Sequence, residues 1–173
     1  AAKSRRLMAP PGDTTRPMTD RMRESLFSSI GHLIPGARVL DLYAGSGSMG
    51  LEALSRGAES AVFVERDRGA LNALRTNIDA LDIGGAVSAS DVDTFLDRGR
   101  GEYDVAFVDP PYAVPLASVV ETVGKLSSLL AQGAVVVVHR RLGEDWPAQI
   151  EDLALVDQRR FGGAELWRYE KER

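Results

Sequence analysis

The feature that most constrains the fold is a short apolar run that ends in closely spaced glycines. Residues 39–44 read Val-Leu-Asp-Leu-Tyr-Ala, which is typical of a strand buried on both faces of a parallel sheet. Gly45 and Gly47 follow, and residues without a Cβ permit positive φ and a close approach by a ligand. Residues 48–56 then read as a helix whose first amides point back toward this loop. A strand, a glycine turn and a helix in this order predict a nucleotide-binding site.

The glycine spacing leaves two classes of ligand open. Gly45, Gly47 and Gly50 satisfy the G-x-G-x-x-G pattern of dinucleotide-binding folds. Glu65 lies 20 residues after Gly45, at the end of the next apolar strand, where ribose hydroxyls are bound. Asp41, however, places a carboxylate beside the loop, which disfavours a diphosphate and favours an ammonium group. S-adenosylmethionine carries an ammonium group and no phosphate, so it is the preferred cofactor. A glycine-rich turn without a ligand is the remaining alternative.

Length and composition indicate one ordinary globular domain. The chain has 173 residues, of which 44% are hydrophobic and 27% charged. It lacks both the apolar run of about 20 residues that a membrane span needs and the apolar core of a signal peptide. It contains no cysteine, and its histidines, His32 and His139, are too few and too far apart for a metal cluster. We therefore expect a cytoplasmic protein that binds neither metal nor membrane. A monomer is expected as well, although composition does not determine the oligomeric state.

The charge of the chain is unevenly distributed. The net charge is −4, but residues 1–25 carry six Lys and Arg against three Asp and Glu, a local charge of +3. This basic arm either contacts nucleic-acid phosphates or is a solvated tail. The phosphate-binding interpretation assigns the contacts to Lys3, Arg5, Arg6 and Arg16.

Taken in order, the chain predicts one helix followed by alternating strands and helices. Thr19 has the character of an N-cap, and apolar residues at helical spacing extend from it to Ile30. Strands are then expected at 38–44, 60–65, 86–89, 103–108 and 133–139, and helices at 48–56, 68–81, 91–98 and 115–131. Two further strands, 153–160 and 164–170, are joined by Phe161-Gly162-Gly163, which indicates a hairpin.

This alternation predicts an α/β, Rossmann-like fold. We expect a mostly parallel seven-stranded sheet with helices on both faces and a C-terminal antiparallel hairpin. The whole chain is expected to form a single domain, with residues 1–30 as the basic arm and helix and residues 37–173 as the core.

A second motif, Asp109-Pro110-Pro111-Tyr112, directly follows the apolar run 105–108. Ligands of open α/β sheets sit beyond the carboxyl ends of the strands, so this motif and the glycine loop should face one crevice. The prolines remove two amide donors and fix φ, which leaves the Asp109 carboxylate and the Pro110 carbonyl as rigid acceptors. Such a pair can hold both hydrogens of an exocyclic amine and aim its lone pair at an electrophilic methyl group. Tyr112 offers a ring on which a base can stack. Asp-Pro-Pro is also a common way to end a strand, which is the structural alternative.

These motifs together resemble a known family. The chain resembles class I S-adenosylmethionine-dependent methyltransferases, and specifically the bacterial 16S rRNA guanine-N2-methyltransferases that modify guanine 966. The resemblance is carried by residues 16–27, 39–47, 50–58 and 109–112, and Arg160-Phe161-Gly162 and Leu166 also fit. The first stretch, Arg-Pro-x-Thr-Asp-Arg-x-Arg-Glu-x-Leu-Phe, is the most specific. Met18 departs from the usual Thr, and the family's N-terminal strand is largely absent.

The resemblance implies methyl transfer from S-adenosylmethionine to the N2 amine of a guanine in 16S rRNA, on the small ribosomal subunit. It implies that the catalytic residues are Asp109, Pro110, Pro111 and Tyr112. The implied cofactor-binding residues are Asp41, Ala44, Gly45, Ser46, Gly47, Glu65, Arg66, Asp91 and Val92. Asp91 and Asp93 could equally cap the following helix. Arg23 and Phe27 are expected to close the cofactor pocket.

Other activities remain open at this stage. An adenine-N6 DNA methyltransferase shares the Asp-Pro-Pro-Tyr motif, but it normally needs a separate target-recognition region, which this chain is not expected to contain. A nicotinamide-dependent oxidoreductase explains the glycines and Glu65, but not Asp41 or Asp109. A nucleotide-binding module without catalytic activity is the last alternative.

Overall fold

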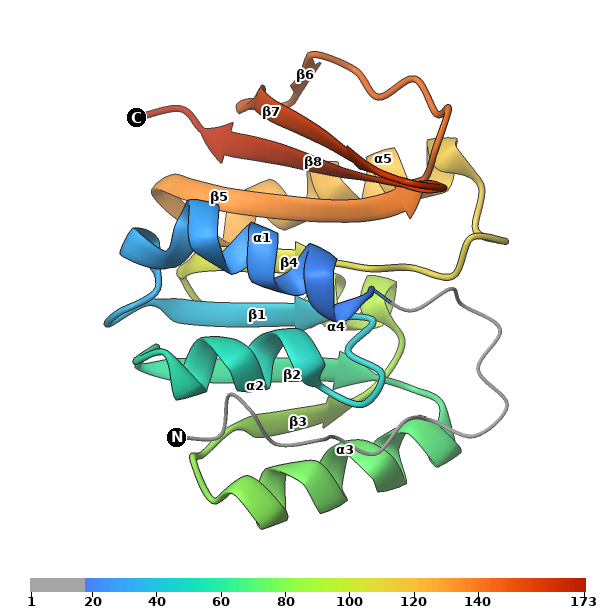
Figure 1. Cartoon of the computed structure of the whole chain (residues 1–173). Coiled ribbons are helices and arrows are strands. Elements are labelled where there is room, and N and C mark those ends of the chain that lie inside the picture. The colour runs from blue at the N-terminus through green and yellow to red at the C-terminus, as the bar shows by residue number, and fades with distance from the viewer. Residues whose placement is uncertain (1–17) are drawn as a thin grey trace.

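The computed structural model describes residues 18–173 and contains one eight-stranded sheet (Figure 1). The strand order is β3-β2-β1-β4-β5-β8-β7-β6. The strands are β1 (Arg38–Leu42), β2 (Ser60–Glu65), β3 (Ala86–Ala89), β4 (Tyr103–Val108), β5 (Leu130–Arg141), β6 (Gln149–Ile150), β7 (Leu153–Phe161) and β8 (Ala164–Lys171). The α-helices are α1 (Asp20–Ile30), α2 (Ser48–Ser55), α3 (Arg68–Leu81), α4 (Val92–Arg98) and α5 (Leu116–Leu126).

Strands β1 to β5 are parallel to one another, whereas β8, β7 and β6 are added antiparallel. The chain starts at β1 in the middle of the sheet, proceeds outward through β2 and β3, and then returns to place β4 on the other side of β1. Strand order therefore reverses between β1 and β4. In open α/β sheets this switch point creates the crevice in which ligands bind.

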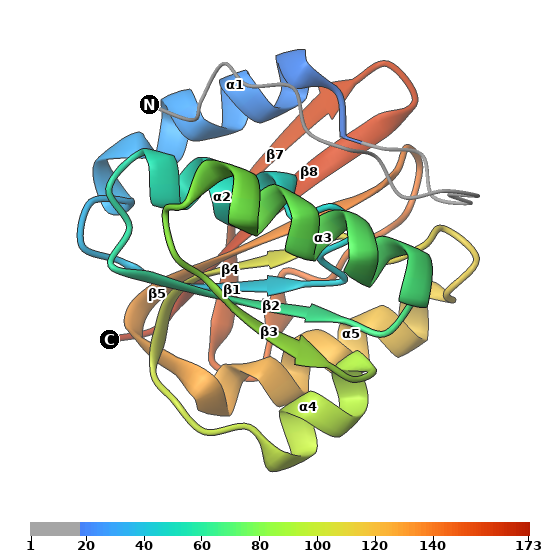
Figure 2. The same ribbon diagram turned by 90° about the horizontal axis from the view of Figure 1, so that it is seen from below.

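The helices cover both faces of the sheet (Figure 2). Helices α1, α2 and α3 lie on one face, and α4 and α5 lie on the other. Thr19 caps α1, as expected, by accepting a hydrogen bond from the Met22 amide at 3.2 Å. The apolar stripe of this helix is buried against the sheet and consists of Met22, Leu26, Phe27 and Ile30. The α/β fold with a parallel sheet, two helical layers and a C-terminal hairpin is confirmed.

The predicted number of strands is wrong by one. The eighth strand, β6, has two residues, which is too short to show any hydropathy period, and it pairs with the start of β7. Several boundaries also differ: β5, for example, spans Leu130–Arg141 and not 133–139. Strand β1 ends at Leu42 because Tyr43 adopts a positive φ of 57°. Helix α5 ends at Leu126 rather than near 131 because β5 begins at Leu130, opposite Tyr103 of β4.

None of the helices within residues 18–173 has the length and apolar character that a membrane span requires.

Candidate active site

The loop between β1 and α2 is held in a conformation that depends on its glycines. Gly45 and Gly47 have φ values of 58° and 88°, in the left-handed region that favours glycine. Gly50 lies in α2, directly against β1 and β2. A Cβ at Gly50 would lie 2.4 Å from the Phe63 ring and 3.2 Å from a carboxylate oxygen of Asp41. The third glycine of the motif therefore lets the helix pack closely on the sheet.

Polar groups of β1, β2 and α3 hold the same loop. Asp41 is buried near the end of β1, and its Oδ2 accepts from the Gly50 amide at 3.0 Å. At the end of β2, Oε1 of Glu65 accepts from the Gly45 amide at 2.8 Å. Asn77 of α3 donates its Nδ2 hydrogen to the Ser46 carbonyl at 3.0 Å. The loop and the first turn of α2 are thus held through their own backbone by residues of three surrounding elements.

This region of the site is strongly acidic. Burial raises the pKa of Asp41 well above its ordinary value of 3.8, and the nearby charges of Asp109 and Glu65 raise it further, against the lowering effect of the Gly50 amide. None of the ion pairs among the described residues involves Asp41 or Glu65. Three carboxylates from β1, β2 and the end of β4 therefore favour a cationic ligand at this edge and disfavour a diphosphate.

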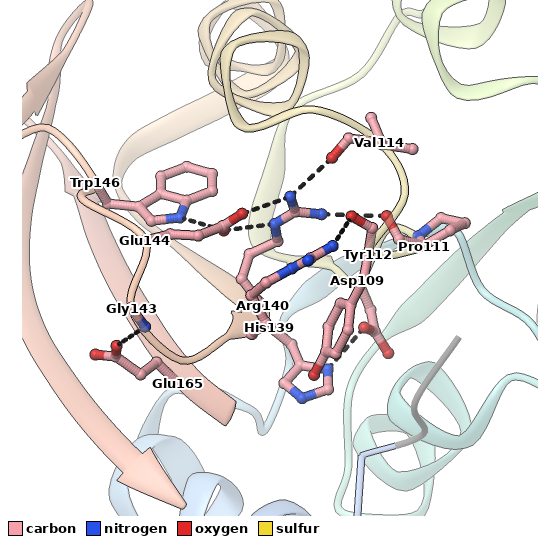
Figure 3. Close-up of polar contacts among 11 residues, drawn as sticks. Asp109, Pro111, Tyr112, Val114, His139, Arg140, Gly143, Glu144, Trp146 and Glu165 are labelled. Atoms are coloured by element: carbon pink, nitrogen blue, oxygen red, sulfur yellow. Dashed lines mark hydrogen bonds and ion pairs between the residues drawn. The ribbon is translucent and has the colours of Figure 1, made fainter. Parts of the chain in front are cut away.

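The second half of the site is the segment 109–114, which leaves β4 and is held by the end of β5 (Figure 3). His139 lies 2.8 Å from Asp109, measured from Nδ1 to Oδ1. The next residue, Arg140, is 1% exposed and donates to the Pro111 carbonyl at 3.1 Å and to the Val114 carbonyl at 2.8 Å. The Asp109 side chain and the backbone that follows it are thus held by two consecutive residues of one strand.

Arg140 is itself fixed by Glu144. Its Nε and Nη2 donate to the two carboxylate oxygens of Glu144 at 2.7 and 2.8 Å, a bidentate arrangement. Burial alone would raise the pKa of Glu144, but hydrogen bonds from Arg140 and Trp146 hold that pKa below its usual value. Arg140 therefore links the 109–114 segment to the chain that follows β5 (Figure 3).

Tyr112 is half-buried between two side chains of β5. The guanidinium of Arg141 lies 5.3 Å from the centre of the tyrosine ring, and Arg141 also donates to the Tyr112 carbonyl. The imidazole of His139 lies 6.0 Å from the ring centre at an interplanar angle of 58°. A cation and a tilted imidazole thus both lie close to the ring that the sequence assigns to base stacking.

Comparisons with known proteins identify the family. The family model described as "Conserved hypothetical protein 95" matches residues 1–170. A protein of Bacillus subtilis named "Putative rRNA methyltransferase YlbH" is 35% identical, with 92% of this chain and 90% of the relative covered. The "Ribosomal RNA small subunit methyltransferase D" of Escherichia coli K12 is 34% identical, with 98% of this chain and 86% of the relative covered. The chain belongs to the family that this model describes, together with these rRNA methyltransferases. The predicted family and the predicted enzyme class, an RNA methyltransferase, are thereby confirmed.

A solved structure shows that other methyltransferases share the fold of this family member. It is the Thermus thermophilus 16S rRNA N2 G1207 methyltransferase in complex with AdoMet and guanosine. Its TM-score is 0.76 at 24% identity, and the superposition covers 94% of this chain and 44% of the other. At that identity the likeness establishes the fold alone.

In this member of the family, the residues expected to bind adenine have structural roles of their own. Asp91 caps α4: its carboxylate accepts from the backbone amide and the hydroxyl of Thr94, both at 2.8 Å. These hydrogen bonds lower the pKa of Asp91. Val92 is buried in the core that α4 and α5 form with the sheet. The capping alternative is therefore what the structure shows, and the adenine contact stays a prediction.

The two residues expected to close the cofactor pocket, Arg23 and Phe27, have different surroundings. Phe27 is completely buried, packs on Phe107 at 5.7 Å between ring centres, and is therefore part of the core beneath α1. Arg23 forms ion pairs with Asp20 and Glu52. The predicted phosphate contacts Lys3, Arg5, Arg6 and Arg16 lie outside the described residues. Within residues 18–173 no three His, Cys, Asp or Glu side chains gather as a metal site would require.

Sequence reasoning missed the residues that hold the site, namely Asn77, His139, Arg140 and Arg141. A signal for three of them was present, because His-Arg-Arg directly follows the apolar run 134–138. In a parallel sheet, such polar residues end up at the same edge as the motif after the neighbouring strand.

Proposed function

We propose that this methyltransferase uses S-adenosylmethionine to methylate the exocyclic N2 amine of a guanine in 16S rRNA, at the position of guanine 966. The observation that carries the proposal is the meeting of three carboxylates, Asp41, Glu65 and Asp109, at the carboxyl edge of β1, β2 and β4. An acidic edge fits a cationic methyl donor and an amine acceptor, and it fits a diphosphate poorly.

The residues around the glycine loop fit S-adenosylmethionine. Asp41 is a buried carboxylate without an ion-pair partner among the described residues, and a cationic group of the cofactor would offset the cost of its burial. Gly45 and Gly47 leave room for close approach of the methionine part. The amides of Gly45, Arg66 and Asp67 already donate to the Glu65 carboxylate, which leaves one of its about four acceptor sites for a ribose hydroxyl. When bound, the cofactor would supply a methyl group carried on a sulfonium.

The 109–114 segment fits the amine of a base. Asp109 Oδ2 makes no hydrogen bond within the described part of the chain, because the bond to His139 uses the other oxygen. Together with the Pro110 carbonyl, this oxygen would accept both amine hydrogens and leave the nitrogen lone pair free to attack. The base would leave its stack to reach this edge and would pack on Tyr112.

Guanine N2 and the small ribosomal subunit are supported by the relatives. The Escherichia coli relative bears the name of a small-subunit rRNA methyltransferase, and the Thermus thermophilus protein of the same fold acts on N2 of a guanine and was solved with AdoMet and guanosine. Phosphate contacts from Lys3, Arg5, Arg6 and Arg16 would add affinity for RNA.

The test is to locate the transferred methyl group. Small ribosomal subunits that lack the modification would be incubated with the protein and tritium-labelled S-adenosylmethionine, and the labelled nucleotide identified by nuclease digestion and mass spectrometry. We expect one N2-methylguanine in 16S rRNA and the loss of most of this label with Asp109→Asn, whose amide is a poor partner for an amine because it presents donors of its own.

Two other outcomes would contradict the proposal in different ways. Label in adenine of a DNA substrate would point to the adenine-N6 alternative. Binding of NAD in place of S-adenosylmethionine in a calorimetric titration would point to the oxidoreductase.

A further inference from the structure

We propose that His139 is a positioning residue that fixes the Asp109 carboxylate for the target amine. The inference rests on the proposed function and adds a residue to it. It concerns orientation, since His139 touches Asp109 and acts on the amine only through that side chain.

The geometry places the two residues as natural partners. Strands β4 and β5 are parallel neighbours, and Val108 of β4 is paired with Val138 of β5. Asp109 and His139 each follow directly, at the carboxyl edge of the sheet. The imidazole is 1% exposed, whereas the Asp109 side chain is 22% exposed and lies 2.8 Å from Nδ1. A buried ring thus fixes a carboxylate that still reaches solvent, and the two side chains face each other in Figure 3.

The hydrogen bond defines the roles of the two imidazole nitrogens. An ionised carboxylate can only accept hydrogen bonds. Nδ1 of His139 therefore carries a hydrogen and donates it in the hydrogen bond to Oδ1 of Asp109. The other nitrogen, Nε2, is buried and has no hydrogen-bond partner among the described residues. A histidine that served only to connect parts of the core would be expected to use both nitrogens. The contact with Asp109 is therefore the polar interaction that accounts for an imidazole at this position.

Fixing one oxygen of Asp109 determines the direction of the other. A carboxylate on a short side chain turns about two single bonds, and Oδ2 is the oxygen left for the amine. With Oδ1 held, Oδ2 and the Pro110 carbonyl keep a constant separation, as holding two amine hydrogens requires. Without the bond, the carboxylate can rotate away from that arrangement while the backbone stays in place, because Arg140 independently holds the Pro111 and Val114 carbonyls.

Two isosteric variants test this role. In His139→Asn the side-chain NH2 takes the place of Nδ1 and keeps a donor for Asp109, whereas in His139→Gln it takes the place of Nε2 and leaves Asp109 without one. We expect His139→Gln, and likewise His139→Leu, to lower kcat for methylation of the small subunit by about 10- to 100-fold. His139→Asn should stay within about fivefold of wild type. KM for RNA and the calorimetric Kd for S-adenosylmethionine should change by less than about threefold in all three variants.

A double-mutant cycle separates positioning from a general structural effect. If His139 acts through Asp109, adding His139→Leu to Asp109→Asn should cause no further loss of kcat. His32→Asn is the control, because His32 is exposed near the opposite edge of the sheet, before β1, and should leave kcat and Tm unchanged.

The possible failures are distinguishable. A wild-type protein that methylates no guanine refutes the proposed function. An active wild type with equal kcat values for the Asn and Gln variants refutes the role of His139 alone, and so does an additive effect in the cycle. If His139→Leu does not fold, the comparison of Asn with Gln still decides, since both variants are polar and differ by one methylene group.

Discussion

The two halves of the active site are held by different means. The glycine loop is fixed through its backbone amides, which donate to Asp41 and Glu65 over 9 and 20 residues of chain. The 109–114 segment is fixed through its carbonyls and one carboxylate, by side chains of β5 that lie 26 to 30 residues away in the sequence. One half therefore presents carboxylates to a cationic ligand, while the other has its acceptors restrained by cations and an imidazole.

The two halves of the site therefore differ in how strongly their shape depends on side chains from another strand. The first loop is held by three separate side chains together with its glycine torsions and the packing of α2, so its shape should survive the loss of any one polar side chain. The second segment has two prolines without amide hydrogens, and its outward carbonyls need donors from elsewhere. Arg140 supplies donors to this segment, so disruption of β5 should distort the 109–114 segment more than the glycine loop.

Arg140→Met is expected to give the largest effect. It leaves Glu144, whose side chain is 13% exposed, without its bidentate partner. It also leaves the Val114 carbonyl without its donor, and the Pro111 carbonyl with the Val114 amide as its remaining donor. Breaking such a buried pair costs about 3–5 kcal/mol of unfolding free energy, measurable by urea denaturation. The control Arg159→Met removes a half-exposed pair with Asp157 and should cost less than about 1 kcal/mol. Equal losses in the two variants would mean that the buried pair has no special role.

Glu65→Ala tests the cofactor half. Loss of charge-assisted hydrogen bonds should weaken S-adenosylmethionine binding by about 1.5–3 kcal/mol, or roughly 10- to 150-fold, in calorimetry. The fold should persist, because α2 stays packed on β1 and β2. Glu59→Ala is the control, since Glu59 is exposed near the opposite end of β2. Unchanged affinity in Glu65→Ala would remove this carboxylate from the cofactor site.

Tyr112 separates base stacking from loop packing. Stacking on an aromatic ring contributes about 1–3 kcal/mol, so Tyr112→Ala should lower kcat/KM by about 5- to 150-fold, and Tyr112→Phe should stay within a few-fold. Tm and cofactor affinity of both variants are measured alongside. A lower Tm together with weaker cofactor binding in Tyr112→Ala would instead assign the ring to packing within the site. A stable alanine variant with wild-type methylation would exclude stacking altogether.

The smallest and most gradual effect is expected from Asp41, which should make both stability and cofactor affinity depend on pH. The native state binds the Asp41 proton more tightly than the unfolded state does, because burial raises its pKa. The stability from this group is therefore fully present below its ordinary value of 3.8 and is lost as pH rises through the raised value. Cofactor affinity should change in the opposite sense and increase with pH as Asp41 ionises. Titrations from about pH 4 to about pH 8 would measure both.

Asp41→Asn should remove both dependences, because the amide does not titrate. If the variant keeps the wild-type pH profile of cofactor binding, another group is responsible for it.

Local signals account for what the sequence predicts correctly. The apolar run and glycines before α2 and the cap at Thr19 can be recognised from neighbouring residues, so a linear pattern shows them. Glu65 can be recognised as the acid that ends the next apolar strand. Asp109 could be placed in the site because a parallel sheet brings the carboxyl ends of its strands together.

The remaining features depend on tertiary contacts. The sequence places His139 and Arg140 at the same edge of the sheet as Asp109, but it does not show that they bond to the Asp109 carboxylate and to the carbonyls of the 109–114 segment. Strand β6 has two residues and is too short to show a hydropathy pattern. For Asp91, a helix cap and an adenine contact both require an acid at the start of α4, so the sequence cannot distinguish the two roles.

Because β5 holds the 109–114 segment, the length of β5 itself is constrained. Successive residues of a strand point to opposite faces, so His139 and Arg140 hold the segment from the two sides of the sheet. Deleting one residue from β5 before His139 would exchange the faces of both side chains and remove both contacts at once. Deleting two would restore the faces but withdraw the pair by about 6.6 Å along the strand. Length changes in homologues should therefore be found in the loops after Arg141 and not between Ala134 and Arg140.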